Sequence, residues 1–188
     1  MKISSPSHVF VLSDLHLDRD EVRREQIILG WKERISENDI VFVLGDVCDN
    51  IKKCKHVFEE LPGQIFLIKG NHDHFNNGHI FDMGITLYET DAVLLYVAHP
   101  YRNFRIILSH KPFPMKRIKN MPKPVNIVIH GHNHRQRKYV KKLGNIFFVN
   151  VIIDNWNYWP LTIDEIIRIV NGERVIINGK DVIYAKSK

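Results

Sequence analysis

The segment QIFLIKGNHD, residues 64–73, places an apolar run directly before a glycine and a cluster of polar side chains. The run QIFLI is short and rich in apolar and β-branched residues, which is typical of a buried strand. A turn needs only one or two polar residues, yet Asn71, His72 and Asp73 all follow Gly70. This surplus of polar side chains indicates that the end of the strand carries chemistry.

The same arrangement, an apolar run that ends in polar side chains, begins with HVFVLS (8–13) and DIVFVLGD (39–46). Helical spacing lies between these runs, over residues 20–35 and 51–61. The first of these helices is predicted to have Asp20 as N-cap and an apolar face of Val22, Ile27, Ile28, Trp31 and Ile35. The order strand, helix, strand, helix, strand predicts parallel pairing with right-handed crossovers.

After residue 80 the pattern changes to strand-like runs separated by short turns. The runs are GITLYE, AVLLYVAH, FRIILSH, VNIVIHGH, KYVKKLG and NIFFVNVIID. They predict a second or mixed sheet, with a short helix within LTIDEIIRIV and a terminal hairpin suggested by the Asn-Gly pairs at 171–172 and 178–179. Neither a repeat nor a linker divides the sequence, so we expect a single domain over residues 1–188.

The composition, with 44% hydrophobic and 26% charged residues, is that of an ordinary globular protein. No run approaches the roughly 18 consecutive apolar residues of a membrane span, and the N-terminus lacks a secretory signal pattern. Two cysteines, Cys48 and Cys54, predict neither a disulfide framework nor a zinc site, which favours the reducing cytoplasm. The net charge of +6 favours anionic partners.

Polar side chains follow five of the predicted strands and are expected to share one crevice, because the carboxyl ends of neighbouring strands converge there. Carboxylates and imidazoles are suitable ligands for Mn, Zn and Fe. The set is too large for one metal ion, whereas two ions about 3.5–4 Å apart with a shared carboxylate would use it fully. The candidates are Asp14, His16, Asp46, Asp49, Asn71, His72, Asp73, His110, His132 and His134.

The order of these residues resembles the signature of the calcineurin-like metallophosphoesterases. The chain has D-x-H at 14–16, G-D-x-x-D at 45–49, G-N-H-D at 70–73, a lone His110 and G-H-x-H at 131–134. Any one block is weak, but the ordered set is specific. The resemblance implies an α/β fold, a four-layer α-β-β-α sandwich of two mixed sheets flanked by helices.

The resemblance also implies a role for each of these residues and two divalent metal ions as cofactors, Mn first, with Fe, Zn or Ni as alternatives. Asp14, His16 and His134 would bind the first metal, Asn71, His110 and His132 the second, and Asp46 would bridge both. His72 would contact the phosphate and assist the leaving group, with Asp73 orienting its ring. We expect Asp49 only to hold its loop through backbone N–H groups.

The implied function is binuclear-metal-dependent phosphoester hydrolysis, by a phosphodiesterase or broad-specificity phosphatase, with a metal-bridging hydroxide as nucleophile. A phosphoserine or phosphothreonine protein phosphatase on the same metal core is the alternative. A non-catalytic scaffold on this fold is a weaker one, because a scaffold needs no intact ligand set.

The segment KPFPMKRIKNMPKP, residues 111–124, carries five cations and no acidic residue directly after His110. It either contacts the anionic flank of a substrate, through Lys111, Lys116 and Arg117 together with Asn71 and His72, or is a solvated loop. RQRKYVKK (135–142) is interpreted as a surface hairpin, and NWNYWP (155–160) as a cover for the core rather than a nucleobase platform. The expected partner is a phosphoester substrate, with nucleotides and nucleic acids among the candidates, and no membrane.

Overall fold

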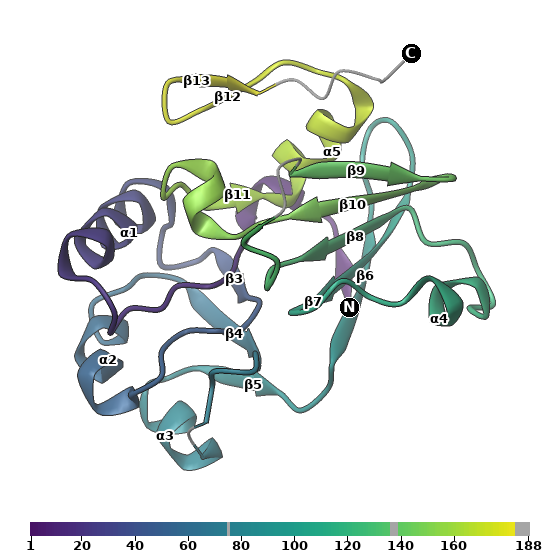
Figure 1. Cartoon of the computed structure of the whole chain (residues 1–188). Helices are drawn as coiled ribbons and strands as arrows, with labels where there is room; N and C mark the ends of the chain where they lie inside the picture. Colours follow the sequence, from purple (N-terminus) through teal and green to yellow (C-terminus); the bar gives the residue numbers. More distant parts are fainter. Residues whose placement is uncertain (75, 136–138, 183–188) are drawn as a thin grey trace.

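Two β-sheets packed face to face form the centre of the molecule (Figure 1). The structure is a computed structural model, which describes residues 1–74, 76–135 and 139–182. The two mixed sheets and their helices confirm the predicted fold class.

The first sheet has five strands in the order β11-β2-β3-β4-β5. Its strands are β2 (Val9–Leu12), β3 (Ile40–Val43), β4 (Gln64–Ile68), β5 (Thr86–Tyr88) and β11 (Leu161–Thr162). Strands β2 to β5 are parallel, as the alternation of strand and helix predicts, and β11 joins β2 antiparallel.

The second sheet has six strands in the order β1-β6-β7-β8-β10-β9 and is mixed. Its strands are β1 (Lys2–Ile3), β6 (Ala92–Val97), β7 (Phe104–Ser109), β8 (Ile127–His130), β9 (Val140–Leu143) and β10 (Ile146–Asn150). Strands β7, β8 and β10 run parallel to one another, so the residues after β7 and β8 leave the sheet at the same edge.

Helices α1 (Glu21–Arg34), α2 (Ile51–Phe58) and α3 (Asn77–Asp82) cover the outer face of the first sheet (Figure 1). Asp20 caps α1 by accepting a hydrogen bond of 2.7 Å from the backbone N–H of Arg23. Trp31 of α1 packs under Val41 and Val43, whereas Val22, predicted for the apolar face, is 66% exposed. The predicted helical spacing is therefore confirmed, but the first turn of α1 extends beyond the edge of the core.

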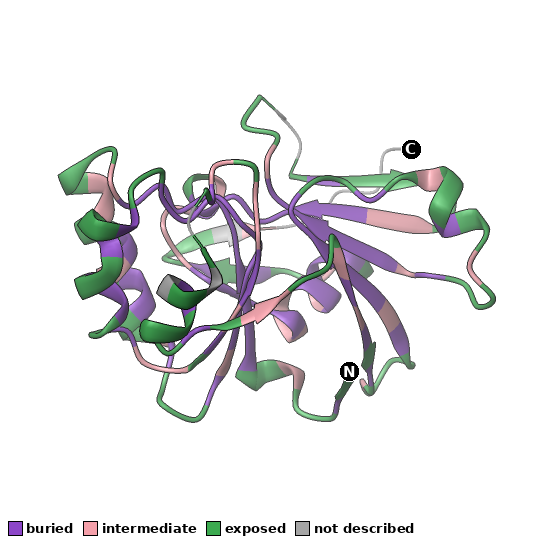
Figure 2. Ribbon diagram, turned by 90° about the horizontal axis from the view of Figure 1, so that it is seen from below, coloured by how far each residue is buried: buried purple, intermediate pink, exposed green. Residues whose placement is uncertain are grey.

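The core between the sheets consists of alternate strand residues, such as Val11 and Phe42 of the first sheet and Phe104 and Ile106 of the second. Figure 2 shows the strands of both sheets largely buried. Helix α5 (Ile163–Asn171) extends this core, and 3₁₀ turns lie at Pro6–His8 (η1) and Ile153–Trp156 (η2).

The predicted terminal hairpin is formed by β12 (Val175–Ile177) and β13 (Lys180–Val182), with Asn178 and Gly179 as its turn. The other Asn-Gly pair does not belong to a hairpin. Gly172 ends α5 in the left-handed conformation, with φ of 89°, which is the usual place of a glycine after a helix.

The outer face of the second sheet is covered at one end by the segment that leads from β7 to β8. Phe113 and Ile118 of this segment, which contains α4 (Met115–Lys119), pack on Ile107, Val128 and Phe148. Within the described ranges, we find no helix that combines the length and apolar character needed to span a bilayer.

Candidate metal centre

The loops after β2, β3, β4, β7 and β8 meet at one edge of the sandwich, as the order of the strands requires. Backbone hydrogen bonds join these loops, because Asp14 N–H donates to Gly45 O over 3.0 Å and Gly131 N–H donates to His110 O over 2.9 Å. The structure thus brings together residues more than 100 positions apart in the sequence, as Asp14 and His132 show.

Four of the predicted ligands lie in the left-handed region of backbone conformation. The φ angles are 60° at Asp14, 40° at His16, 54° at Asp46 and 65° at His132. Residues other than glycine adopt this region rarely and at a cost in free energy, and they concentrate at functional sites. Arg23 supports the first of these loops by donating to the carbonyl oxygen of Asp14 over 2.8 Å.

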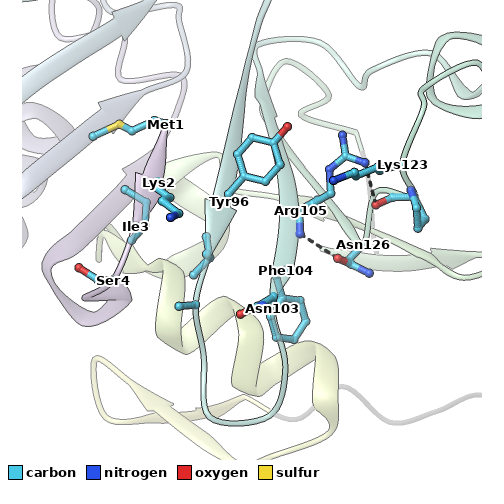
Figure 3. Close-up of a pocket in the computed structure, with 13 residues that line it drawn as sticks. Met1, Lys2, Ile3, Ser4, Tyr96, Asn103, Phe104, Arg105, Lys123 and Asn126 are labelled. Atoms are coloured by element: carbon cyan, nitrogen blue, oxygen red, sulfur yellow. Dashed lines mark hydrogen bonds between the residues drawn. The ribbon is translucent and has the colours of Figure 1, made fainter.

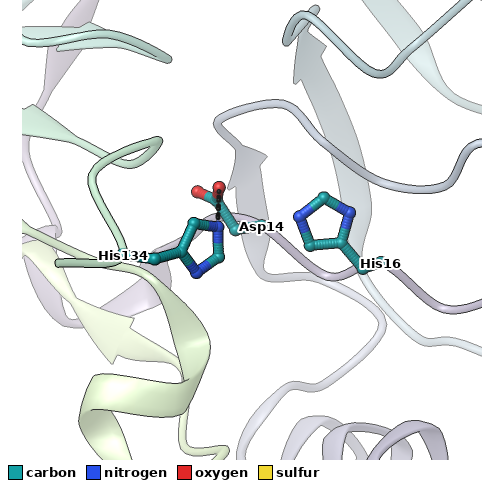
Figure 4. Close-up of side chains that lie close together, drawn as sticks. All are labelled: Asp14, His16 and His134. Atoms are coloured by element: carbon teal, nitrogen blue, oxygen red, sulfur yellow. Dashed lines mark ion pairs between the residues drawn. The ribbon is translucent and has the colours of Figure 1, made fainter. Parts of the chain in front are cut away.

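Asp14, His16 and His134 form the first candidate group (Figure 4). Their ligand atoms lie within 4.8 Å of one another, and Nε2 of His134 lies 3.0 Å from Oδ1 of Asp14. Asp14 Oδ1 and His16 Nδ1 are buried and, among the described residues, make no hydrogen bond of good geometry. A buried carboxylate oxygen such as Asp14 Oδ1 needs a partner, and a cation held by this group would provide one.

Burial, reinforced by the positive charge of Arg19, lowers the pKa of His16 to about 4. The imidazole of His16 is therefore neutral at pH 7. A neutral imidazole is the form that coordinates metal ions, since its unprotonated nitrogen supplies the lone pair.

Asp46, His110 and His132 form the second candidate group, again with ligand atoms within 4.8 Å of one another. Asn71 joins this group through Oδ1, which lies 3.0 Å from Nε2 of His110. Nδ1 of His110 lies 2.8 Å from the carbonyl oxygen of Leu44. An Nδ1–H that donates to this carbonyl fixes the tautomer with Nε2 unprotonated and directed at the group, as in histidines that bind metals.

Asp46 connects the two groups. Its Oδ2 lies 3.9 Å from Nε2 of His16 in the first group, and its Oδ1 lies 3.5 Å from Nε2 of His110 in the second. The other six predicted metal ligands therefore lie in two groups that the buried carboxylate of Asp46 connects. Carboxylate, imidazole and amide donors in this number suit two divalent cations of the Mn, Fe or Zn type.

His72 lies beside the first group, with its ring centroid 5.5 Å from that of His16. The expectation that Asp73 orients this ring is wrong. The carboxylate of Asp73 turns inward and accepts backbone hydrogen bonds of 2.8–2.9 Å from Asp46, Val47 and Gly70. Asp73 therefore holds the loop of the connecting carboxylate in place and does not contact the ring of His72.

Asp49 takes the position expected of Asp73, because its Oδ1 lies 2.8 Å from Nδ1 of His72. The loop-holding role predicted for Asp49 falls to Asp18, which accepts the backbone N–H groups of Asp49 and Asn50. The physical reason for this exchange is the direction in which each side chain points. Side chains of neighbouring turn residues point to opposite sides, so adjacency in sequence does not decide which carboxylate meets the ring.

Arg19 is a site residue that sequence reasoning missed. Its Nε donates to Oδ2 of Asp49 over 2.9 Å, and its terminal nitrogen lies 3.3 Å from Nδ1 of His72. The hydrogen bond from Arg19 lowers the pKa of the Asp49 carboxyl. The signal in the sequence was a single arginine within the polar loop that follows the first strand, five residues after Asp14.

The remaining predicted residues lie outside the metal centre or beside it. Lys111 and Arg117 line a cavity of about 510 Å³ together with Asn71 and His110, whereas Lys116 is exposed on α4 and does not line this cavity. Trp156 is buried and donates to the carbonyl oxygen of Asn150 over 2.8 Å, which confirms its packing role. Residues 136–138 of the basic segment 135–142 lie outside the described residues.

Neither cysteine is placed to act as a nucleophile. Cys48 and Cys54 are both buried, and their mutual hydrogen bond, together with burial, raises the pKa of the Cys48 thiol far above its usual value. A thiol held in this form is unreactive.

Gly131 offers a steric test of the first group. A Cβ at this position would overlap Ser13 Oγ and Asp14 Oδ2. We expect Gly131→Ala to displace Asp14, to lower the metal content measured by mass spectrometry and to reduce the melting temperature. Gly78→Ala in α3 is the matched control and should keep both quantities, because an added Cβ would lie 3.3 Å from Oδ1 of Asn76, a side-chain atom that needs to move by only a few tenths of an ångström. Unchanged metal content in Gly131→Ala would exclude Asp14 as a ligand.

Known proteins resemble this chain in sequence and in fold. The Calcineurin-like phosphoesterase superfamily domain matches residues 8–151. The uncharacterized protein MJ1445 of Methanocaldococcus jannaschii is 23% identical over 195 residues, which cover 93% of this chain and 97% of that protein.

Two solved structures share the fold over most of the chain. The protein of unknown function AQ665 from Aquifex aeolicus matches with a TM-score of 0.62 and 21% identity, over 85% of this chain and 97% of its own. The nuclease MPE of Pseudomonas putida matches with a TM-score of 0.53 and 16% identity, over 95% of this chain and 88% of its own.

Proposed function

The chain belongs to the calcineurin-like phosphoesterase superfamily, which makes it a hydrolase of phosphoester bonds, and from this premise we propose that it is a phosphodiesterase with two metal ions. The observation that carries the proposal is the position of Asp46 between two groups of metal-type ligands. A broad-specificity phosphatase is the alternative on the same metal core.

Seven side chains would hold the two cations. The proposed ligands are Asp14, His16 and His134 for one ion, Asn71, His110 and His132 for the other, and Asp46 for both. When bound, divalent cations polarise phosphoryl oxygens and lower the pKa of a bound water. Manganese is proposed first, with iron, zinc and nickel as alternatives, because the set contains oxygen and imidazole donors and no thiolate.

His72 is proposed to protonate the leaving group. Asp49 holds Nδ1 of its ring, which leaves Nε2 as the nitrogen that can face a substrate. As the P–O bond breaks, Nε2–H of the imidazolium would give its proton to the leaving oxygen, while the carboxylate of Asp49 holds Nδ1 of the ring. The side chain of His72 is 40% exposed, so a substrate can reach it.

The charges near the site favour a diester over a monoester. A monoester carries two negative charges and a diester one, and Arg19 is the one arginine that the described residues place against His72. Arg19 is already paired with Asp49, and Arg117, in the neighbouring cavity, is already paired with Asp91. A protein phosphatase would need arginines that clamp the phosphate beside the site, but Arg102 and Arg105, which precede His110 in the sequence, stack on Phe104 and Tyr96 at the far end of β6 and β7. The proposed substrate contacts are Asn71, His72, Lys111 and Arg117. Lys116 is not among them, because it does not line the cavity beside the metal centre.

Paired chromogenic esters test the proposal. The protein should be inactive after chelation, and Mn²⁺ should restore hydrolysis of bis(p-nitrophenyl) phosphate with a kcat/KM at least about tenfold above that of p-nitrophenyl phosphate. Parallel assays with Ni²⁺, Zn²⁺ and Mg²⁺ rank the metals. Faster hydrolysis of the monoester with every metal would assign the protein to the phosphatases, and activity that survives chelation would refute the metal centre.

A further inference from the structure

A row of basic and aromatic side chains crosses the outer face of the second sheet, away from the metal centre (Figure 3). Lys2 pairs in register with Tyr96, and Tyr96 pairs with Arg105, so the three residues lie on one face of β1, β6 and β7. The guanidinium carbon of Arg105 lies 5.4 Å from the centre of the Tyr96 ring. Lys123, from the segment before β8, completes the row.

This row lines a cavity of about 1010 Å³. The charged side chains of its lining are Lys2, Arg105 and Lys123, and the lining contains no carboxylate side chain. Among the described residues Arg105 has no ion pair, and its Nε is buried without a hydrogen-bond partner. The guanidinium donates only a long hydrogen bond of 3.5 Å to the carbonyl oxygen of Pro124. The cavity is therefore suited to an anion.

Two further cavities lie between the row and the metal centre. The cavity that contains Asn71 and His110 shares Asp91, Phe113 and Arg117 with a second one of about 270 Å³. Ala92, Leu94 and Ile107, from the outer face of β6 and β7, line the second cavity. Tyr96, two residues further along the same face of β6, lines the cavity of the row, which shares no lining residue with the second cavity. We call this succession of cavities the β6 groove.

We propose that the β6 groove binds a single-stranded nucleic acid, which extends from the metal centre to the row of Lys2, Tyr96 and Arg105. The proposal rests on the proposed function, since a phosphodiester of the same strand would be the substrate. Lysine and arginine side chains line both ends of the groove, and the net charge of the chain is +6. At the far end, Lys2, Arg105 and Lys123 make no ion pair among the described residues, so phosphates of the strand would be their anionic partners. At the end beside the metal centre, Arg117 already pairs with Asp91 over 3.0 Å.

The floor of the groove favours an unpaired strand over other polyanions. Leu94 is partly exposed and Tyr96 is 43% exposed, so bases can pack on aliphatic and aromatic surface. A duplex keeps its bases inside, and an acidic peptide offers no regular series of rings. The five residues from Arg105 to His110 span about 16 Å, which a stacked strand at about 3.4 Å per nucleotide covers with about five nucleotides.

Fluorescence anisotropy with the Mn²⁺-loaded full chain tests the proposal. The probes are labelled oligothymidylates of 2, 5 and 10 nucleotides with phosphorothioate linkages, which keep the charge and resist hydrolysis. Affinity should rise at least about tenfold from 2 to 5 nucleotides and change little from 5 to 10. Tyr96→Leu keeps apolar area but removes the ring, and it should weaken binding of the decamer at least about fivefold.

Charge reversal locates the binding face. The double variant Lys2→Glu, Lys123→Glu should weaken decamer binding at least about tenfold and reduce the slope of log affinity against log salt by about 1.4, for two lost phosphate contacts. Its kcat/KM for bis(p-nitrophenyl) phosphate should stay within about twofold, because both lysines lie at the far end of the groove. The control Lys53→Glu, Lys55→Glu makes the same charge change on α2 and should bind like the wild type.

Several outcomes would overturn the assignment. Equal weakening in both double variants would show general attraction by net charge, and affinity that does not depend on length would exclude an extended site. Equal competition by an acidic peptide of the same charge would assign the groove to polypeptides. A protein that cleaves the chromogenic diester but fails these binding tests refutes the groove alone. One that binds as expected but hydrolyses no ester refutes the proposed function alone.

Discussion

Asp46→Asn is expected to abolish phosphoester hydrolysis and to lower the metal content of the protein at the same time. The carboxylate of Asp46 lies between His16 and His110, with a side-chain exposure of only 3%. Asparagine keeps the size of the side chain but removes the negative charge that two cations would share. We expect kcat/KM to fall at least about 10³-fold, with initial rates and metal content measured on the same samples.

Asp82→Asn provides the matched control for this prediction. Asp82 is exposed at the end of α3, outside both ligand groups, and its substitution changes the net charge by the same amount. This variant should keep wild-type rates and metal content. Full activity and full metal content in Asp46→Asn would remove Asp46 from its connecting position and, with it, the two-metal proposal.

His72→Asn is expected to lower kcat by about 10²–10⁴-fold while both metal ions stay bound. His72 lies beside the first ligand group, but no described ligand atom depends on its ring, whose Nδ1 contacts Asp49 instead. Loss of the proton donor should matter most for leaving groups of high pKa. The measurement is a series of aryl diesters, in which the variant should show a steeper dependence of log kcat on the leaving-group pKa than the wild type.

Asp49→Asn is the companion variant, because it keeps an oxygen against Nδ1 of His72 but removes the charge. It should lower kcat less than His72→Asn, and in the double variant the two losses should not add, since both act through one imidazole. A loss of metal in His72→Asn would place His72 among the ligands. A leaving-group dependence like that of the wild type would exclude proton donation by this residue.

The sequence predicts the position of the site better than its inner contacts. Strand runs that end in Asp14, Asp46 and Asn71 must meet at one edge once the strands of the first sheet pair in parallel, whereas His110 joins them only through the packing of the second sheet on the first. The fold class follows from the same runs and from the helical spacing of residues 20–35. Strand order thus predicts the edge of the sandwich at which these residues lie.

Contacts that depend on the direction of a side chain could not be predicted in this way. Asp73 and Asp49 exchange their expected roles because one carboxylate turns into the loop and the other turns out of it. Arg19 reaches the site through its long side chain, so its loop position gave little indication of its contacts. The prediction that Asn171 and Gly172 belong to the terminal hairpin is wrong, because an Asn-Gly pair ends a helix as readily as it makes a turn.

The left-handed backbone at Asp14, His16, Asp46 and His132 has a consequence for how such a protein can change over time. Aspartate, asparagine and histidine are the non-glycine residues that tolerate this conformation best, and they are also donors that divalent cations accept. The residue types that suit these turns are therefore also residue types that can coordinate a metal ion. A descendant can exchange one of these side chains for another, and so lose or alter its chemistry, while the loop keeps its shape.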